Sequence, residues 1–136
     1  MKEINLVAKV ENLDDVLAFI DAELEAMDCP MKAQMQIDVA VEEVFVNIAS
    51  YAYEGKEGPS NIKIEKTADG SAVAITFTDE GIPYNPLEKE DPDVTLSAEE
   101  RQIGGLGIFI VKKSMDATDY KREGNKNIFR LEKKLS

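Results

Sequence analysis

The residues from about 31 to 53 most constrain the fold, because their pattern is helical and apolar on more than one face. A helix of that kind is expected to be largely buried against other parts of its own chain. Its apolar positions include Met35, Val39 and Phe45. The carboxylates and the asparagine within the same segment are then the anomaly, because polar groups that are buried need partners.

The segments around this helix alternate apolar and polar residues, as half-buried strands do. Such alternation is found from Ile4 to Val10 and over 61–67, 72–78, 117–123 and 126–134. Further helices are predicted over 13–27, with Asn12 as N-cap, and over 106–116. Helices among hairpin-linked strands predict a two-layer α/β (α+β) sandwich, with a mixed or antiparallel sheet and the helices on one face. The other face is left for solvent or a partner.

Length and composition limit the function classes. The 136 residues show no linker or internal repeat, which predicts a single domain over residues 1–136. The net charge of -11, with no basic stripe, argues against direct binding of nucleic acid or of an anionic membrane. The absence of histidine excludes Ser-His-Asp triads and His-ligated zinc. A lone cysteine, Cys29, and the lack of a leader or spanning segment favour a cytoplasmic location.

Two polar residues of the long helix share one face. Glu43 and Asn47 are four residues apart, whereas Glu42 points about a hundred degrees away. A carboxylate and an amide placed together could orient a hydroxyl or water and give one oxygen ligand to Mg²⁺. The spacing is equally compatible with a half-exposed helix face that holds a Glu–Asn pair.

Asp79 ends the strand over 72–78 and is followed by Glu80 and Gly81. An ionised aspartate at the mouth of a pocket could accept a hydrogen bond from the exocyclic amine of adenine. Gly81 would allow the backbone to approach closely. A plain turn at the end of a strand is the alternative, because Asp and Gly are both favoured in turns.

A glycine-rich stretch opens the third helix. Its residues are Gly104, Gly105, Leu106 and Gly107. Backbone N–H groups at such a place can bind phosphate, and the helix dipole adds to the attraction. A hinge or a close-packed turn explains the glycines as well. Because no Gly-Lys-Ser/Thr follows, the stretch is not a Walker loop.

Together these three motifs are much more specific than any one of them. A helix with Glu43 and Asn47, a strand that ends at Asp79, and glycines that open a helix supply what an adenine nucleotide needs. One part would take the metal, one the base and one the phosphates. In a chain this acidic, the triphosphate would rely on backbone N–H groups, Mg²⁺ and few cations.

In this order, the motifs resemble the nucleotide-binding boxes of the ATPase superfamily that contains gyrase, heat-shock chaperone ATPases, MutL-type repair proteins and histidine kinases. The short length, the DEGIPYNP wording and the ending GGLGIFIVKKSMD are most similar to its anti-sigma-factor serine/threonine kinase branch. The resemblance covers nearly the whole chain and implies the histidine-kinase-like ATPase (Bergerat) fold. It also implies ATP and Mg²⁺ as cofactors.

The resemblance implies a role for each motif residue. It makes Glu43 the general base and Asn47 the Mg²⁺ ligand, and it places Asp79 and Gly81 at adenine. The phosphate-binding glycines fall on 104, 105 and 107, with Leu106 between them.

The chain also departs from the pattern of the branch. Tyr51 stands where the branch often has histidine, and Pro83 replaces a second glycine of the wider superfamily. Arg101 lies a residue or two from the usual place of an arginine. Two interpretations of Arg101 stay open: its side chain would reach the γ-phosphate, or it would be a solvated residue of the lid. The proline-rich, charged segment from Pro83 to Ile103 is predicted to be a mobile lid.

Three functions compete. The first is a serine/threonine kinase that acts in partner switching on a small anti-sigma-antagonist-like protein, with a sigma factor as a further partner. The second is a nucleotide-gated binding module without catalysis. The third is a detached histidine-kinase catalytic domain, which would need an acceptor in another protein. The resemblance leaves open whether the chain forms a homodimer.

Overall fold

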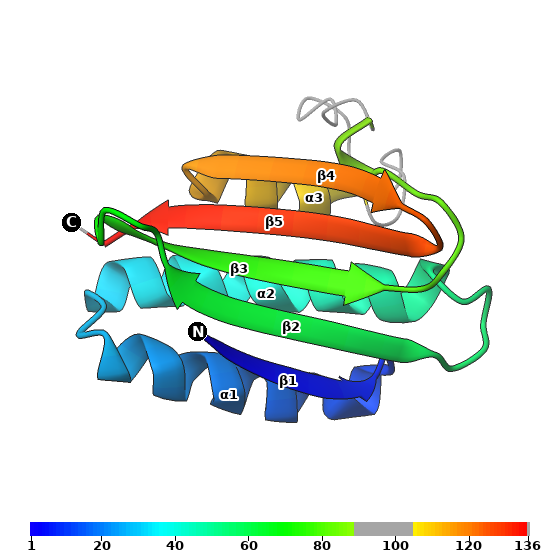
Figure 1. Cartoon of the computed structure of the whole chain (residues 1–136), viewed down its shortest axis with the longest axis horizontal. Helices are drawn as coiled ribbons and strands as arrows, with labels where there is room; N and C mark the ends of the chain where they lie inside the picture. Colours follow the sequence, from blue (N-terminus) through cyan, green and yellow to red (C-terminus); the bar gives the residue numbers. More distant parts are fainter. Residues whose placement is uncertain (89–104, 136) are drawn as a thin grey trace.

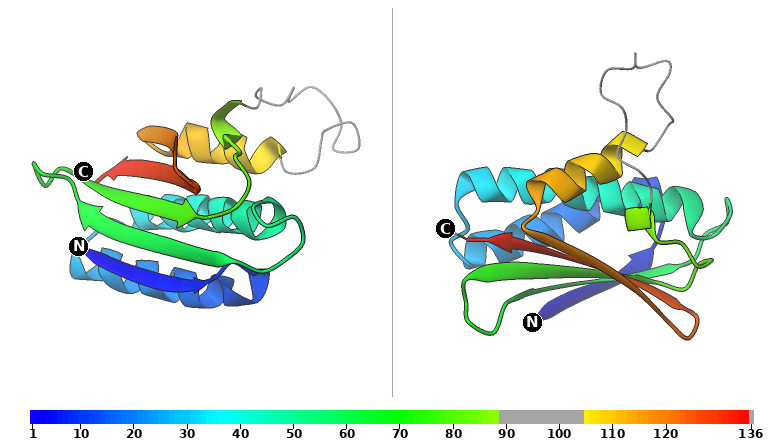
Figure 2. Two further views of the ribbon diagram at one scale, coloured as in Figure 1. Left: turned by 45° about the vertical axis from the view of Figure 1, so that its right-hand side comes forward. Right: turned by 90° about the horizontal axis from the view of Figure 1, so that it is seen from above.

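The computed structural model describes residues 1–88 and 105–135. Within these residues, five strands form one sheet, and three α-helices cover one of its faces (Figures 1 and 2). Every strand pairing in this part of the chain is antiparallel. The two-layer α/β sandwich with helices on one face is therefore confirmed, and its sheet is antiparallel rather than mixed.

Each predicted helix and strand is present, although the first strand ends at Val7 instead of Val10 and the long helix at Tyr51 instead of residue 53. The elements are β1 (Lys2–Val7), η1 (Val10–Asn12), α1 (Leu13–Ala26), α2 (Met31–Tyr51), β2 (Pro59–Lys66), β3 (Ala72–Asp79), η2 (Pro86–Glu88), α3 (Gly105–Ser114), β4 (Ala117–Glu123) and β5 (Lys126–Lys134). In space the strands follow the order β1-β2-β3-β5-β4. The C-terminal hairpin therefore lies beside β3, and β1 and β4 form the two edges (Figure 1).

The core lies between the helices and the inner face of the sheet. Cross-strand neighbours point to the same face. Phe77 pairs with Ile62 on one side and with Phe129 on the other, and all three are buried. One end of the same face turns polar, because Asp79 pairs with Ser60 and with Asn127. The functional site is built over this polar row.

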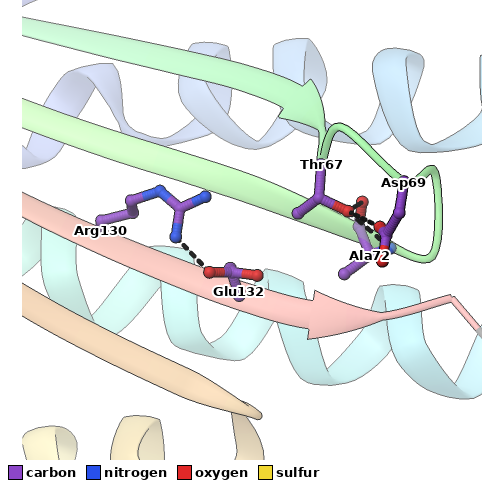
Figure 3. Close-up of polar contacts among 5 residues, drawn as sticks. All are labelled: Thr67, Asp69, Ala72, Arg130 and Glu132. Atoms are coloured by element: carbon purple, nitrogen blue, oxygen red, sulfur yellow. Dashed lines mark hydrogen bonds and ion pairs between the residues drawn. The ribbon is translucent and has the colours of Figure 1, made fainter.

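The outer face of the sheet carries no helix in the described residues (Figure 2). Arg130 and Glu132 form an ion pair there, side by side along β5 (Figure 3). At the turn between β2 and β3, Asp69 accepts hydrogen bonds from the Thr67 hydroxyl at 2.7 Å and from the Ser71 backbone at 3.0 Å. These donors lower the pKa of Asp69 to about 2.

Two details differ from the sequence-based expectations. Asn12 stands at the start of α1, but its side chain does not cap the helix. Its Nδ2 instead donates to the carbonyl of Val7 at 2.8 Å, and the chain turns away from β1 at that point. Met35 and Val39 of α2 are 63% and 43% exposed, because a single helical layer leaves the face opposite the sheet uncovered.

The predicted lid, from Pro83 to Ile103, falls for the most part outside the described residues. Its described beginning runs into η2, and Leu87 packs against the core there. No helix in residues 1–88 or 105–135 combines the length and the apolar character needed to cross a membrane.

Candidate functional site

Glu43 and Asn47 project from α2 next to the first turns of α3. Val41 and Phe45 bury the opposite side of α2 in the core, which fixes how the helix is rotated about its axis. Glu43 and Asn47 line one cavity together with Gly107, and this cavity has an empty volume of about 460 Å³. The predicted sharing of one helix face by the two residues is therefore confirmed.

The carboxylate of Glu43 lies against the backbone of Gly107. A Cβ atom at position 107 would come within 2.2 Å of Glu43 Oε2, so a larger residue would displace the end of the Glu43 side chain. Burial raises the pKa of Glu43, and the neighbouring charge of Glu42 raises it further. A carboxyl group with a raised pKa retains more basicity near neutral pH, as a general base requires.

Asn47 has a buried side-chain oxygen, Oδ1, without a hydrogen-bond partner in the described part of the chain. A buried acceptor in this state is unfavourable unless a ligand satisfies it. An amide oxygen is a suitable ligand for Mg²⁺, which is usually held by one or two protein groups plus phosphate and water oxygens. Residues 1–88 and 105–135 hold no cluster of three His, Cys, Asp or Glu side chains for a metal. The Asn47 oxygen therefore fits a Mg²⁺ that takes its other ligands from phosphate and water oxygens.

A second, largely apolar cavity adjoins the first and has an empty volume of about 410 Å³. Asn47, Tyr51 and Ile108 line both cavities. The remaining walls of the second cavity come from α2 and the residue after it, from β3, β4 and β5, and from residues 84 and 86 near η2. They are formed by Val44, Ile48, Ala52, Asp79, Tyr84, Pro86, Tyr120, Asn127 and Phe129.

Asp79 supplies the carboxylate of this cavity and is only 5% exposed. Its Oδ1 accepts a hydrogen bond from the Gly81 backbone at 2.9 Å and another from Asn127 Nδ2 at 2.9 Å. Among the described residues, no hydrogen bond is made to its Oδ2. The carboxylate therefore keeps one oxygen as an acceptor at the wall of an apolar cavity.

Gly81 serves the site by packing against the end of α2. A Cβ atom at position 81 would lie 2.2 Å from the carbonyl oxygen of Ala52. That same oxygen accepts a hydrogen bond from the Ile82 backbone at 2.9 Å. The close approach expected of Gly81 is thus made to the backbone of α2, and it holds the segment after β3 against the helix.

The structure brings Asp79 and Gly107 to the two cavities beside Glu43 and Asn47, from which they are distant in sequence. Gly105 and Leu106 form the first turn of α3. The other two candidate residues, Arg101 and Gly104, lie outside the described residues.

Sequence reasoning missed Asn127 and Tyr120, which line the apolar cavity. A signal for Asn127 was present. It shares the inward phase of β5 with Phe129 and Leu131, where an apolar residue would be expected. Tyr120 faces Phe129 from β4 and points inward with it.

The arrangement can bind a flat, largely apolar ring with one hydrogen-bond donor in the cavity of Asp79. It can also place an anion and its cation in the cavity of Asn47 and Gly107, with the Glu43 carboxylate beside them.

Comparison with known proteins identifies the family of the chain. Residues 6–133 match the family described as the histidine kinase-like ATPase domain. The chain is 27% identical over 123 residues to an anti-sigma F factor of Clostridium perfringens, covering 90% of this chain and 87% of that protein. It is 26% identical over 116 residues to an anti-sigma F factor of a Thermoanaerobacter species, covering 85% and 80%. A serine/threonine-protein kinase of Bordetella bronchiseptica, BtrW, is 24% identical over 96 residues, covering 71% and 67%.

Solved structures share the fold. A histidine kinase domain from a blue-light-activated histidine kinase of Erythrobacter litoralis superposes with a TM-score of 0.59 at 17% identity, covering 93% of this chain and 60% of that chain. The catalytic domain of the histidine kinase ThkA gives a TM-score of 0.50 at 15% identity, covering 99% and 98%. The expected fold is thereby confirmed.

Proposed function

Because this chain belongs to the histidine kinase-like ATPase domain family, we propose that it binds Mg-ATP in the two adjoining cavities. The observation that carries the proposal is the buried carboxylate of Asp79 at the wall of an apolar cavity. Adenine is flat and apolar on its faces, and its exocyclic amine donates a hydrogen bond. Asp79 Oδ2 would accept that bond, whereas guanine would present an acceptor at the same place.

The second cavity would hold the phosphates. Asn47 Oδ1 would bind the Mg²⁺ that neutralises them, which would satisfy an oxygen that has no hydrogen-bond partner within residues 1–88 and 105–135. The backbone at the start of α3, with Gly105 and Gly107, would donate to phosphate oxygens. Gly104 and Arg101 belong to this proposal on the sequence resemblance alone.

We propose further that the chain is a serine/threonine protein kinase that acts in partner switching. Glu43 would accept the proton of a Ser or Thr hydroxyl on a partner protein while the hydroxyl oxygen bonds to the γ-phosphorus of ATP. The bond from that phosphorus to the β–γ bridging oxygen would break, and ADP would leave. The raised pKa of Glu43 and its place beside the phosphate cavity support this role.

The relatives support the regulatory setting. Two are named anti-sigma F factor and a third is named a serine/threonine-protein kinase. By this similarity, the partners would be a small antagonist-like protein domain and a sigma factor. The absence of histidine in the chain argues against a histidine kinase, because the phosphoacceptor would then have to come from elsewhere.

A matched pair of variants tests the kinase proposal. Glu43→Gln keeps the shape of the side chain but removes the base, and Glu42→Gln makes the same change at an exposed position. The acceptor protein is first identified by ATP-dependent affinity capture and phosphosite mapping. Glu43→Gln should then keep ATP binding and lose about 10²–10⁴-fold in phosphotransfer rate, whereas Glu42→Gln should not. Phosphotransfer at the unmodified rate by Glu43→Gln would favour a nucleotide-gated binding module.

A further inference from the structure

Asn127 is the most completely hydrogen-bonded side chain of the apolar cavity, and it is only 5% exposed. Its Nδ2 donates to Asp79 Oδ1 at 2.9 Å and to the Ile82 carbonyl at 2.7 Å. Its Oδ1 accepts from the Tyr120 hydroxyl at 2.5 Å and from the Tyr84 backbone at 3.4 Å. Both donor and both acceptor positions of the amide are thus used.

Packing alone does not explain an amide at this position. The inward neighbours along β5 are Phe129 and Leu131, so an apolar side chain would continue the pattern of the strand. A buried amide is unfavourable unless its hydrogen bonds are made. Three of its four partners lie at the wall of the cavity, and one of these is the carboxylate proposed to bind the base.

The carboxylate of Asp79 needs such a partner because its terminal torsion is broad and roughly two-fold. Hydrogen bonds from Gly81 and Asn127 both reach Oδ1, and together they define the plane of the carboxylate. With Oδ1 held in this way, Oδ2 is left as the acceptor for the cavity.

Asn127 in turn needs a partner, because the two ends of an amide are nearly equal in shape. In the reversed orientation, its oxygen would face the Asp79 carboxylate, and two acceptors would be in contact. The Tyr84 N–H can only donate to Oδ1 and the Ile82 carbonyl can only accept from Nδ2, so they favour the orientation that presents Nδ2 to Asp79. The Tyr120 hydroxyl adds a second, shorter hydrogen bond to Oδ1 in that orientation.

We propose that Asn127 is a positioning residue that fixes the Asp79 carboxylate for adenine, and that Tyr120 acts through Asn127. This inference rests on the proposed function, because it assumes that adenine occupies the apolar cavity. Asn127 and Tyr120 then determine base specificity through Asp79.

The test compares two nucleotides on the full chain in the presence of Mg²⁺. ATP carries the exocyclic amine, and purine riboside 5′-triphosphate lacks it. The unmodified chain should bind ATP more tightly by about tenfold or more, since a hydrogen bond to a charged group is lost with the second ligand.

Two variants probe the positioning. Tyr120→Phe removes one hydroxyl and should weaken ATP binding about 3- to 10-fold, with binding of purine riboside triphosphate unchanged. Asn127→Leu removes the donor to Asp79 and should weaken ATP binding more than Tyr120→Phe does. Its binding of purine riboside triphosphate should again be unchanged. Tyr120→Phe keeps the inference testable if Asn127→Leu does not fold, which thermal melting would reveal.

Thr118→Val is the matched control. Thr118 lies two residues before Tyr120 on β4, on the same face, and does not line the cavity. This variant should change the affinity for neither nucleotide.

The outcomes distinguish a failure of the proposed function from a failure of the positioning role. An unmodified chain that fails to bind ATP contradicts the proposed function, and this inference with it. If the unmodified chain binds ATP, but Tyr120→Phe weakens the affinity for both nucleotides equally or for neither, only the positioning role is contradicted.

Discussion

At the residue scale, the side-chain oxygen of Asn47, which is buried without a partner among the described residues, gives a prediction about Mg²⁺. Asn47→Leu replaces the amide with an apolar side chain of similar size. It should weaken ATP binding by about tenfold or more when Mg²⁺ is present, because a metal ligand is lost. Calorimetry with Mg²⁺ and with EDTA provides the measurement. With EDTA the variant and the unmodified chain should bind equally weakly, and an equal affinity in Mg²⁺ would remove Asn47 from the metal role.

Asp79 gives a prediction about base selectivity. In Asp79→Asn, the donors from Gly81 and Asn127 would attract the amide oxygen, so the amide nitrogen would face the cavity. ATP affinity should fall by about 1.5–3 kcal/mol, because a charge-assisted hydrogen bond is lost. Discrimination against GTP should fall as well, because guanine presents an acceptor to that nitrogen. Equilibrium titrations with both nucleotides decide the matter, and an unchanged ATP affinity in a folded variant would refute the role of Asp79.

Individual residues differ in how far the sequence reveals them. Glu43 and Asn47 could be paired from sequence because a helix puts residues four apart on one face. The bond between Asp79 and Asn127 joins residues 48 positions apart, and only the pairing of β3 with β5 brings them together. The side chain of Asn12 was misjudged because an asparagine can donate to a nearby carbonyl as readily as it can cap a helix.

At the element scale, two glycines hold α2 in contact with its neighbours in different ways. A methyl group at position 81 would meet the backbone of Ala52, which cannot move aside, whereas one at position 107 would meet the tip of the Glu43 side chain. Gly81→Ala should therefore destabilise the fold by about 1–3 kcal/mol. Gly107→Ala should leave the melting temperature nearly unchanged but reduce phosphotransfer, because it displaces the carboxylate.

The two glycine variants control for each other in thermal melting and in phosphotransfer assays. A large loss of stability in Gly107→Ala would mean that the contact with Glu43 is structural. Unchanged melting of Gly81→Ala would mean that the segment after β3 can shift away from α2.

Element boundaries were predictable where the chain carries residues that break helices and strands. Pro30 precedes α2, and the turn after it contains Gly55, whose φ is 84°. The burial of α2 was predicted less well. Met31, Met35 and Val39 form an exposed row along the helix, because the number of helical layers is not encoded in the periodicity of one helix.

At the scale of the whole molecule, the packing of α1 against α2 makes stability depend on pH. Burial and, to a smaller extent, the neighbouring Asp21, both as a hydrogen-bond partner and through its charge, together raise the pKa of Asp38 to about 7. An unfolded Asp has a pKa of about 3.9. The folded state therefore holds a proton that the unfolded state releases, and the resulting stabilisation, complete below about pH 4, is lost as the pH rises through 7.

Asp38→Asn should remove this dependence. At pH 8 the free energy of unfolding of the variant should exceed that of the unmodified chain by at most about 1 kcal/mol, because the carboxyl group is partly exposed. At pH 4 the two chains should be about equally stable. Asp15→Asn changes an exposed carboxylate of α1 and serves as the control. Parallel melting curves for the Asp38 variant and the unmodified chain across this range would contradict the assignment.

The strand order carries a consequence for the growing chain. β5 inserts between β3 and β4, so a strand made after both of its neighbours completes the wall in which Asp79 is held. A nascent polypeptide that has α2 and β3 but not yet β5 has no donor from Asn127 for the buried carboxylate. During synthesis, the ability to recognise a base would therefore appear only after the C-terminal hairpin has left the ribosome, and chains truncated before Asn127 would lack it.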